Sequence, residues 1–373
     1  MLTVHVGLHK TGSTAIQNAL SGMTREELRG IHYRGLNSAA GNDKFFESTR
    51  DLFQVPPRAD RSPTVQLLRA GHHVVLSHET FLGHPWLPDT GEMYRHAVSG
   101  AAAMRSYFHD RTPFQIVIYL RTQNEWLESL YNQYAKSTAP AVNSTQFAER
   151  AMEARNFRWA QLISDLKEEV GPDRLIVRPY HPGINVTADF LTILALPTPQ
   201  RLLQTKRENP SRSPGWLSLQ QQLHDLLETA GDPDLLSWAR MLDNGRESGE
   251  SNADYSMFTE DTQSRLIEIT ASDWEYLPKV VADTHLAEPH RFESLAKGGQ
   301  QARIKPYFGS LDKVSASEEA VRLLIAALPY VRTHPRNLPT RVKAMAARIR
   351  TKVQADSKDL SRETIAFLRR QLT

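Results

Sequence analysis

Apolar residues gather in four short runs along the first half of the chain, each bounded by polar or turn-forming residues. The runs are Leu2–Gly7, His73–Ser77, Phe114–Leu120 and Leu175–Arg178. Short apolar runs of this kind are typical of strands that are buried on both faces of a parallel sheet. The pattern therefore predicts a parallel sheet that contains these four strands.

Helical periodicity lies between the predicted strands. Residues 14–21, 94–109 and 147–169 repeat their apolar positions at intervals of three and four, which predicts helices with one buried face. Gly171 and Pro172 follow the last of these segments and predict its end. Strands that alternate with helices indicate an α/β fold in which helices flank the sheet. Residues 36–63 are polar and rich in turn formers, so we expect an irregular segment there.

The pattern changes in the second half of the chain, where helical periodicity occurs without a strand pattern. Residues 216–243, 258–277 and 315–373 are the predicted helical segments, and Pro278 is predicted to end the second of them. We therefore divide the chain into an α/β core over residues 1–215 and a mostly helical C-terminal region over residues 216–373.

The charge of the chain is modest overall but uneven near its end. The formal net charge is +3, which does not by itself indicate a nucleic-acid partner. Residues 341–370 hold nine Lys or Arg against three Asp or Glu. Such a helix is typical of a solvated surface, and an acidic glycan, a membrane surface or a partner protein are the alternative contacts.

Two absences in the sequence narrow the class of protein. The chain has no cysteine, which excludes disulfides and thiolate metal ligands. No apolar run approaches the ~20 residues of a membrane span, and the first predicted strand begins at Leu2, which leaves no room for a signal peptide. We therefore expect a cytoplasmic protein without a transmembrane segment.

The segment from His9 to Thr14, His-Lys-Thr-Gly-Ser-Thr, joins the first predicted strand to the first predicted helix. A Gly- and Ser/Thr-containing loop before a helix presents free backbone N–H groups and the positive end of the helix dipole to an anion. The spacing differs from the ATP-binding pattern G-x-x-x-x-G-K-[ST], because Lys10 precedes Gly12. Taken alone, the segment also fits an ordinary strand-to-helix turn with a surface lysine.

A second group of polar residues follows the third predicted strand. Arg121 comes directly after Leu120, and Thr122 and Glu125 form a T-x-x-E capping box that predicts a helix start at Thr122. Arg121 is therefore expected at the carboxyl end of a strand, where ligands bind in open α/β sheets. The planar guanidinium of an arginine suits a phosphate, and the hydroxyl of Ser129, two turns into the helix, adds a further donor.

These two segments together resemble the donor-binding motifs of sulfotransferases that use 3′-phosphoadenosine 5′-phosphosulfate (PAPS). Lys10–Thr14 resembles their loop for the 5′-phosphosulfate, with Ser13 where threonine is more usual, and Arg121 with Ser129 resembles their pair for the 3′-phosphate. Three more segments resemble bacterial carbohydrate-type members: Trp126–Gln133, Leu76–Phe81 and Leu175–Tyr180. The resemblance covers about residues 1–215 and implies a P-loop-type α/β fold.

The resemblance also implies roles for individual residues in transferring a sulfuryl group from PAPS to an acceptor hydroxyl. Arg121 and Ser129 would bind the 3′-phosphate, and Lys10 would stabilise the charge on the departing 5′-phosphate. No metal is expected. The residues implied for the 5′-phosphosulfate are Lys10, Thr11, Gly12, Ser13 and Thr14.

A general base is the other requirement of this chemistry. Ser77-His78-Glu79 closes the second predicted strand, so both ionisable side chains are expected at the same edge of the sheet as the loop. Glu79 is the first candidate for the base, because nearby phosphate charge raises a carboxylate pKa, and His78 is the second. By analogy with the family, the acceptor is a hydroxyl on a glycan or glycolipid and the enzyme is bacterial. Oligomerisation is left open.

Two other functions fit parts of the sequence. A small-molecule kinase on the same kind of fold would need magnesium and the standard G-K-[ST] lysine, and this sequence lacks the latter. A nucleotide-binding partner protein without catalysis would keep the phosphate-binding residues and use the basic C-terminal segment for docking. The C-terminal region could also contribute to an acceptor site.

Overall fold

The structure of the chain is a computed structural model. It describes residues 1–35, 63–83, 85, 93–108, 112–137, 144–181, 183–203, 256–293 and 304–305. The chain forms two compact units, of which the first comprises Met1–Leu130, Thr145–Asn209 and Asp261–Ile304 and the second Tyr131–Ser144, Pro210–Glu260 and Lys305–Thr373. Several sequence predictions fall outside the described residues: the irregular segment over 36–62 and the helical segments 216–243 and 315–373, with the basic stretch 341–370.

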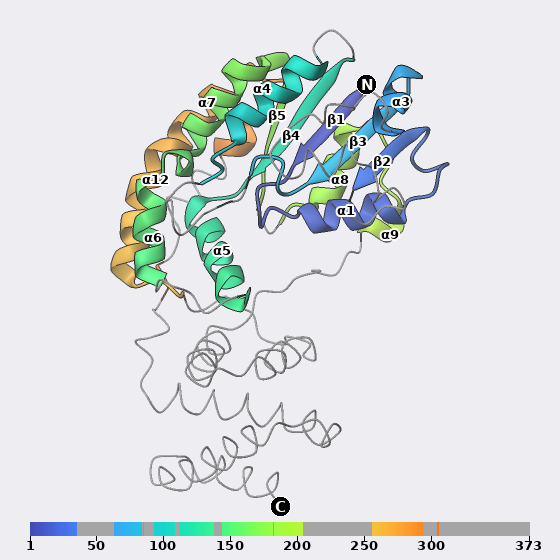
Figure 1. The fold of residues 1–373 in the computed structure, drawn as a ribbon. Helices are drawn as coiled ribbons and strands as arrows, with labels where there is room; N and C mark the ends of the chain where they lie inside the picture. Colours follow the sequence, from blue (N-terminus) through green and yellow to red (C-terminus); the bar gives the residue numbers. More distant parts are fainter. Residues whose placement is uncertain are drawn as a thin grey trace, which may run out of the picture. The chain divides into compact units, whose positions relative to one another are not determined.

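Five parallel strands form a sheet in the first unit, in the order β2-β3-β1-β4-β5 (Figure 1). The four predicted strands are confirmed, and with them the α/β class. The bounds of the strands are Leu2–Val6 for β1, Ile31–Gly35 for β2, His73–His78 for β3, Phe114–Leu120 for β4 and Leu175–Pro179 for β5.

Strand β2 was not predicted from the sequence. Its five residues pair only with β3, and just two of them, Tyr33 and Gly35, are buried. An edge strand with so few apolar positions has no run long enough to separate it from a polar turn.

Strand β1 lies at the centre of the sheet, between β3 and β4. Val6, its last residue, lies beside His78 of β3 and Ile118 of β4. The chain builds β2 and β3 on one side of β1 and then crosses to build β4 and β5 on the other. The strand order therefore reverses at β1, and the carboxyl edge beside such a reversal is where open α/β sheets bind ligands.

Helices cover both faces of the sheet (Figure 1). Helices α1 and α8 lie over one face, and α4 and α7 over the other. Among the described helices, none is both long and apolar enough to cross a membrane. The helix bounds are Ser13–Gly22 for α1, Pro63–Arg69 for α3, Ala97–Phe108 for α4, Gln123–Ser137 for α5, Ser144–Glu153 for α6, Trp159–Val170 for α7, Val186–Ile193 for α8, Gln200–Leu203 for α9 and Glu260–Val281 for α12.

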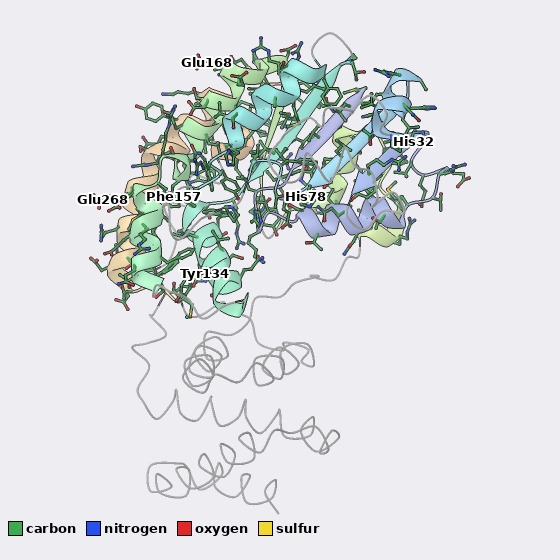
Figure 2. The ribbon with its side chains drawn as sticks, in the orientation of Figure 1. His32, His78, Tyr134, Phe157, Glu168 and Glu268 are labelled. Atoms are coloured by element: carbon green, nitrogen blue, oxygen red, sulfur yellow. The ribbon has the colours of Figure 1, made fainter. Side chains whose placement is uncertain are left out.

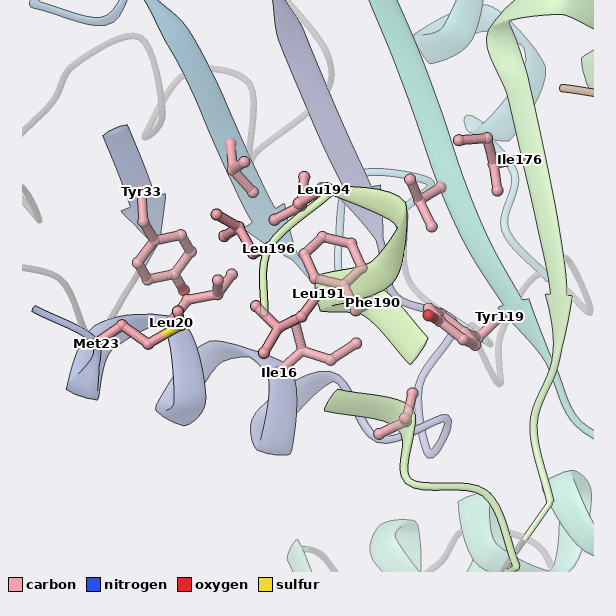
Figure 3. Packing of buried hydrophobic residues seen from close by; sticks show 13 residues of the cluster. Ile16, Leu20, Met23, Tyr33, Tyr119, Ile176, Phe190, Leu191, Leu194 and Leu196 are labelled. Atoms are coloured by element: carbon pink, nitrogen blue, oxygen red, sulfur yellow. The ribbon is translucent and has the colours of Figure 1, made fainter. Parts of the chain in front are cut away.

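The core beneath α1 and α8 joins the two helices to the central strands. Ile16 and Leu20 of α1 pack with Phe190 and Leu191 of α8 against β3, β4 and β5 (Figure 3). All four side chains are at most 2% exposed. Burial of large apolar side chains is worth about 1.5–3 kcal/mol each, so this packing fixes the start of α1 against the sheet.

The sheet face toward α1 and α8 also carries a row of buried polar groups. Gln115 Nε2 donates to Thr3 Oγ1 at 2.9 Å, and His5 Nδ1 lies 2.8 Å from Ser77 Oγ. Gln17 of α1 reaches Ser77 Oγ at 3.4 Å. Complete burial lowers the pKa of His5 to about 3, so His5 is neutral in the folded protein at ordinary pH.

The predicted helix over residues 147–169 is wrong as a single element. Helix α6 ends at Glu153, a 3₁₀ turn follows over Arg155–Phe157, and α7 begins at Trp159. Asn156 holds this break, because its Nδ2 donates to the carbonyl oxygens of two residues that lie more than sixty positions earlier, Met93 and Tyr94. A partner so distant in sequence leaves no trace in the local periodicity.

The prediction that Pro278 ends the last described helix is also wrong. Helix α12 runs three residues beyond Pro278, to Val281. The proline removes one backbone hydrogen bond, but Leu277 and Val281 are fully buried on either side of it. Tertiary packing therefore carries the helix past the proline.

The buried His5 predicts a loss of stability in mild acid. The unfolded chain takes up a proton at His5 near the ordinary pKa of 6.5, whereas the folded protein does not until about pH 3. Between these values His5 contributes a loss of about 1.4 kcal/mol of unfolding free energy per pH unit. Urea unfolding of wild type and His5→Gln at pH 7, 6 and 5 measures this slope, which should be shallower in the variant by about that amount. Parallel slopes would contradict the assignment, and His285→Gln is the control.

Candidate functional site

The loop between β1 and α1 has a backbone that is shaped for close approach by an anion. Lys10 and Gly12 both have positive φ angles, 67° and 84°. Gly12 is the N-cap of α1, and its carbonyl oxygen accepts the backbone N–H of Ile16 at 3.2 Å. Gly12 has no side chain with which to cap this end of α1, and no acidic residue lies in the first turn of the helix. The positive end of the helix therefore faces the loop without a counter-charge from the helix itself.

The glycines of this loop leave no room for side chains. A Cβ on Gly7 would lie 2.0 Å from Ser13 Oγ, and a Cβ on Gly12 would lie 2.8 Å from Cγ1 of Val186 in α8. Ser13 Oγ is itself buried and has no hydrogen-bond partner among the described residues. A buried hydroxyl without a partner carries a desolvation cost, which a ligand oxygen at this position would offset.

The peptide groups beside His9 are held from both sides by aromatic side chains. The backbone N–H of His9 donates to the hydroxyl of Tyr94 at 3.1 Å, and the indole Nε1–H of Trp126 donates to the carbonyl oxygen of His9 at 2.7 Å. Thr11 Oγ1 donates to the carbonyl oxygen of Leu8 within the loop. Tyr94 and Trp126 are both fully buried, so the loop conformation is fixed by groups from two other elements.

Lys10, Glu79 and Arg121 come together at the carboxyl edge of the sheet, as the strand order requires. Glu79 follows β3 and Arg121 follows β4, on the two sides of the loop. Burial lowers the pKa of Lys10, with Glu79 raising it and Arg121 lowering it. Burial raises the pKa of Glu79, and the charge of Lys10 opposes that rise. A carboxylate and a lysine ammonium therefore influence each other here in a poorly solvated site.

The neighbours of Glu79 include a second ionisable group. His9 Nε2 lies 4.0 Å from Glu79 Oε2. The Glu79 side chain is 31% exposed, whereas that of His9 is 11% exposed. Glu79 is therefore accessible from solvent while it remains in contact with the buried loop.

His78 is the last residue of β3, and Figure 2 labels it near the start of α1. Its Nδ1 accepts the backbone N–H of Thr80 at 3.0 Å and lies 2.7 Å from Thr80 Oγ1. A backbone N–H can only donate, so Nδ1 of a neutral His78 is the acceptor and Nε2 carries the proton. In this arrangement the basic nitrogen of the imidazole is engaged with Thr80.

Arg121 is oriented by three contacts. Its Nε donates to Glu125 Oε2 at 3.2 Å, and its guanidinium lies 5.9 Å from the ring centre of Tyr180. The indole Nε1–H of Trp159 donates to its carbonyl oxygen at 2.8 Å. Helix α5 begins at Gln123 with Thr122 before it, and the Thr122 carbonyl oxygen accepts the N–H of Trp126 at 2.8 Å.

The predicted helix start is confirmed to within one residue, but the predicted capping box is wrong. Thr122 Oγ1 is buried without a hydrogen-bond partner among the described residues. Glu125, the other half of the box, contacts Arg121 instead. The Glu125 carboxylate therefore lies against a guanidinium, and Thr122 Oγ1 does not form its half of the box.

Two of the sequence candidates are placed by their helices but not joined to the other groups. Thr14 lies in the first turn of α1 and Ser129 in the second turn of α5, and both are half-buried. Among the described residues, no hydrogen bond links Ser129 to Arg121.

The turn that carries Arg121 is held from behind by α12. Gln123 Nε2 donates to Asp273 Oδ2 at 2.6 Å, and the Trp274 indole donates to Gln123 Oε1 at 2.6 Å. Asp273 also accepts the backbone N–H groups of Trp159 and Ala160 at the start of α7. One carboxylate from α12 thus caps α7 and anchors the first residue of α5.

Sequence reasoning missed Tyr94, Gln123 and Asp273 as parts of this site. It quoted Trp126 only within a motif, without a role. Each of these residues acts through a bond to a residue at least 34 positions away. The only local signal is that Trp126 lies on the helix that begins beside Arg121.

Comparison with known proteins gives limited matches. No protein-family model matches the chain. An uncharacterized protein of Archaeoglobus fulgidus is 35% identical over 103 residues, which are 26% of this chain and 27% of that protein. The chain therefore matches about a quarter of the length of that relative.

Among solved structures, the chain is similar to the crystal structure of a sulfotransferase from Alicyclobacillus acidocaldarius. The identity is 12% and the TM-score 0.40, with 75% of this chain and 95% of that chain covered. At this level the similarity establishes no family. The α/β class stands on the strands and helices described above, and any function has to be inferred from the site residues.

The crowding at Gly12 predicts a selective sensitivity to substitution. An alanine at position 12 would have a strained positive φ and its Cβ would clash with the side chain of Val186. Gly71 has a similar φ of 82° but open space around it. We expect Gly71→Ala to lower the free energy of unfolding by about 1 kcal/mol from backbone strain. Gly12→Ala should cost about 1–3 kcal/mol more from overpacking. Urea unfolding measures both, and equal losses would show that the loop has room for a methyl group.

Proposed function

We propose that the chain is a PAPS-dependent sulfotransferase that transfers the sulfuryl group to a hydroxyl of a glycan or glycolipid acceptor. The observation that supports this most is the meeting of Lys10, Glu79 and Arg121 at the edge where the strand order reverses. A cation on an anion-binding loop, a carboxylate on one side of it and a guanidinium on the other supply what this reaction needs.

The residues of the loop fit the 5′-phosphosulfate of the donor. The start of α1, whose N-cap is a glycine, offers backbone N–H groups, and Ser13 Oγ is a buried hydroxyl for which the described residues supply no partner. When bound, the donor supplies a sulfuryl group on a phosphoanhydride oxygen. Lys10 would then stabilise the negative charge that develops on the departing 5′-phosphate. Thr11 maintains the loop through its bond to Leu8, and Thr14 offers a second hydroxyl.

Arg121 is the proposed ligand of the 3′-phosphate, which distinguishes PAPS from ATP. The Arg121 side chain is 17% exposed and its guanidinium lies 5.9 Å from the ring centre of Tyr180, so the side chain is both accessible and oriented. A fork of two charged hydrogen bonds to a phosphate is the strongest contact that this residue type makes. Ser129, further along α5, is proposed as an additional donor.

Glu79 is the proposed general base. Burial raises the pKa of Glu79, which brings its basicity closer to what proton removal near neutral pH requires. His78 was the second candidate from the sequence, and its bond from the Thr80 N–H supports the choice of Glu79. The proton of the acceptor hydroxyl would pass to Glu79 as the hydroxyl oxygen attacks the sulfur. The resemblance to bacterial carbohydrate-type enzymes supports the glycan acceptor and a cytoplasmic, bacterial enzyme.

Calorimetric titration without magnesium tests the donor site. Adenosine 3′,5′-bisphosphate should bind wild type and ATP should not compete effectively, because ATP lacks the 3′-phosphate. Arg121→Ala should weaken bisphosphate binding about 10- to 100-fold, the worth of a hydrogen bond to a charged group. Arg174→Ala is the matched control, since Arg174 also lies against an aromatic ring, Phe114, but at the opposite edge of the sheet. ATP binding without preference for the 3′-phosphate would overturn the proposal in favour of a kinase.

The pH dependence of turnover tests the base. With PAPS and an acceptor found by screening p-nitrophenyl glycosides, kcat/KM should fall in acid with a midpoint above 4.5, the ordinary glutamate value. Glu79→Gln should lose this limb and about 10²–10⁴-fold of the rate. Lys10→Ala should shift the midpoint upward, because the charge of Lys10 lowers the pKa of Glu79. Loss of the limb in His78→Gln, with Glu79→Gln retaining it, would reassign the base.

A further inference from the structure

The carboxylate of Glu125 accepts a hydrogen bond from one nitrogen, Nε, of the guanidinium that the proposed function assigns to the 3′-phosphate. Arg121 Nε and Glu125 Oε2 are 3.2 Å apart, and the two residues are one helical turn from each other. The side chains differ in exposure, 17% for Arg121 and 46% for Glu125. Glu125 is therefore the more exposed partner of this pair, and its departure would leave Nε of Arg121 free for a ligand.

A second binding place for Glu125 is already present at the start of α5. In a capping box the acid at the third helical position accepts the N–H of the N-cap residue, and the N-cap hydroxyl accepts the N–H of the acid. Thr122 and Glu125 have this spacing, yet Thr122 Oγ1 is buried without a hydrogen-bond partner among the described residues. The sequence therefore contains both residues of a capping box, but the structure does not show the bond of the Thr122 hydroxyl that the box requires.

From these two observations we propose that Glu125 is an internal competitor for the 3′-phosphate, with two alternative positions. In the free protein its carboxylate binds Arg121, and when a 3′-phosphate binds there the carboxylate moves to the Thr122 N–H and closes the capping box. This inference rests on the proposed function, because it takes Arg121 as the 3′-phosphate ligand.

Electrostatics favours the move of the Glu125 carboxylate when a phosphate binds at Arg121. A phosphate dianion at Arg121 repels a carboxylate held at the same guanidinium, whereas a carboxylate in the first turn of α5 is stabilised by the helix dipole. An exposed pair at four-residue spacing is weak, so a phosphate that makes two charged hydrogen bonds displaces it. Glu125 thereby weakens the binding of ligands with a 3′-phosphate and speeds release of the bisphosphate product.

Substitution of Glu125 by glutamine distinguishes its proposed competition with the phosphate from its proposed role in the capping box. Glutamine keeps the length of the side chain and can still close the box, but it carries no charge to hold Arg121 or repel phosphate. In calorimetric titrations, Glu125→Gln should bind adenosine 3′,5′-bisphosphate about five- to tenfold more tightly than wild type does. Its affinity for adenosine 5′-monophosphate should be unchanged, and the gain should vanish in an Arg121→Ala background.

Glu168→Gln is the matched control. It removes the same charge from an exposed position on α7 that Figure 2 shows well away from His78. An equal gain in this control, or no gain in Glu125→Gln, would overturn the inference while an Arg121-dependent preference for the bisphosphate still stands. If wild type binds bisphosphate and monophosphate equally and Arg121→Ala changes neither, the proposed function itself fails.

Thr122→Val tests the second position of the carboxylate. Valine has nearly the same shape and lacks the hydroxyl, which has no partner within the part of the chain that the structure describes. The thermal midpoint without ligand should therefore not fall, while bisphosphate affinity should drop about fivefold, the worth of one N-cap. A clear fall in the ligand-free midpoint would show that Thr122 already caps α5 in the free protein and would overturn the exchange.

Discussion

The central position of β1 is the constraint on which the candidate site depends. Because β3 and β4 pair with β1 on opposite sides, the residues that follow these strands flank the loop that follows β1. Parallel strands all end at the same edge of the sheet. The strand order therefore brings Glu79, Lys10 and Arg121 close together, and no contact among their side chains is needed for this. The chemistry of the edge is set by backbone pairing, and the side chains then modify one another's charge.

The two faces of the sheet contribute differently to this arrangement. On the face toward α1 and α8, the central strands carry four buried polar residues that form hydrogen bonds in pairs: Thr3 with Gln115, and His5 with Ser77. Such bonds are directional, so they specify the register of the strands more sharply than apolar contacts do. The helix that presents the anion-binding loop thus rests on the face with the more specific core.

The sequence alone predicted four of the five strands and the residues that follow two of them at the carboxyl edge, and the reason is physical. Strand ends are visible in local apolar runs, and in a parallel sheet the polar residue after each run must lie at the common edge, which places Glu79 and Arg121. The roles of Tyr94, Asn156 and Asp273 could not be predicted, because each bonds to a residue between 62 and 150 positions away. The predicted capping box was wrong for a related reason. Glu125 had two possible local partners, the Thr122 N–H and the Arg121 guanidinium, and sequence spacing does not rank the energies of these two contacts.

The bond between Gln123 and Asp273 has a consequence for how the protein is made. The two residues are 150 positions apart, and ribosomes add residues at about 5–20 per second, so roughly 10–30 s separate their synthesis. Throughout that interval the buried amide of Gln123 and the start of α7 lack their final partner. The supports of the anion-binding loop, which are Tyr94, Trp126 and α8, are all made before α12, whereas the arginine-bearing turn reaches its final support only after α12 has left the ribosome.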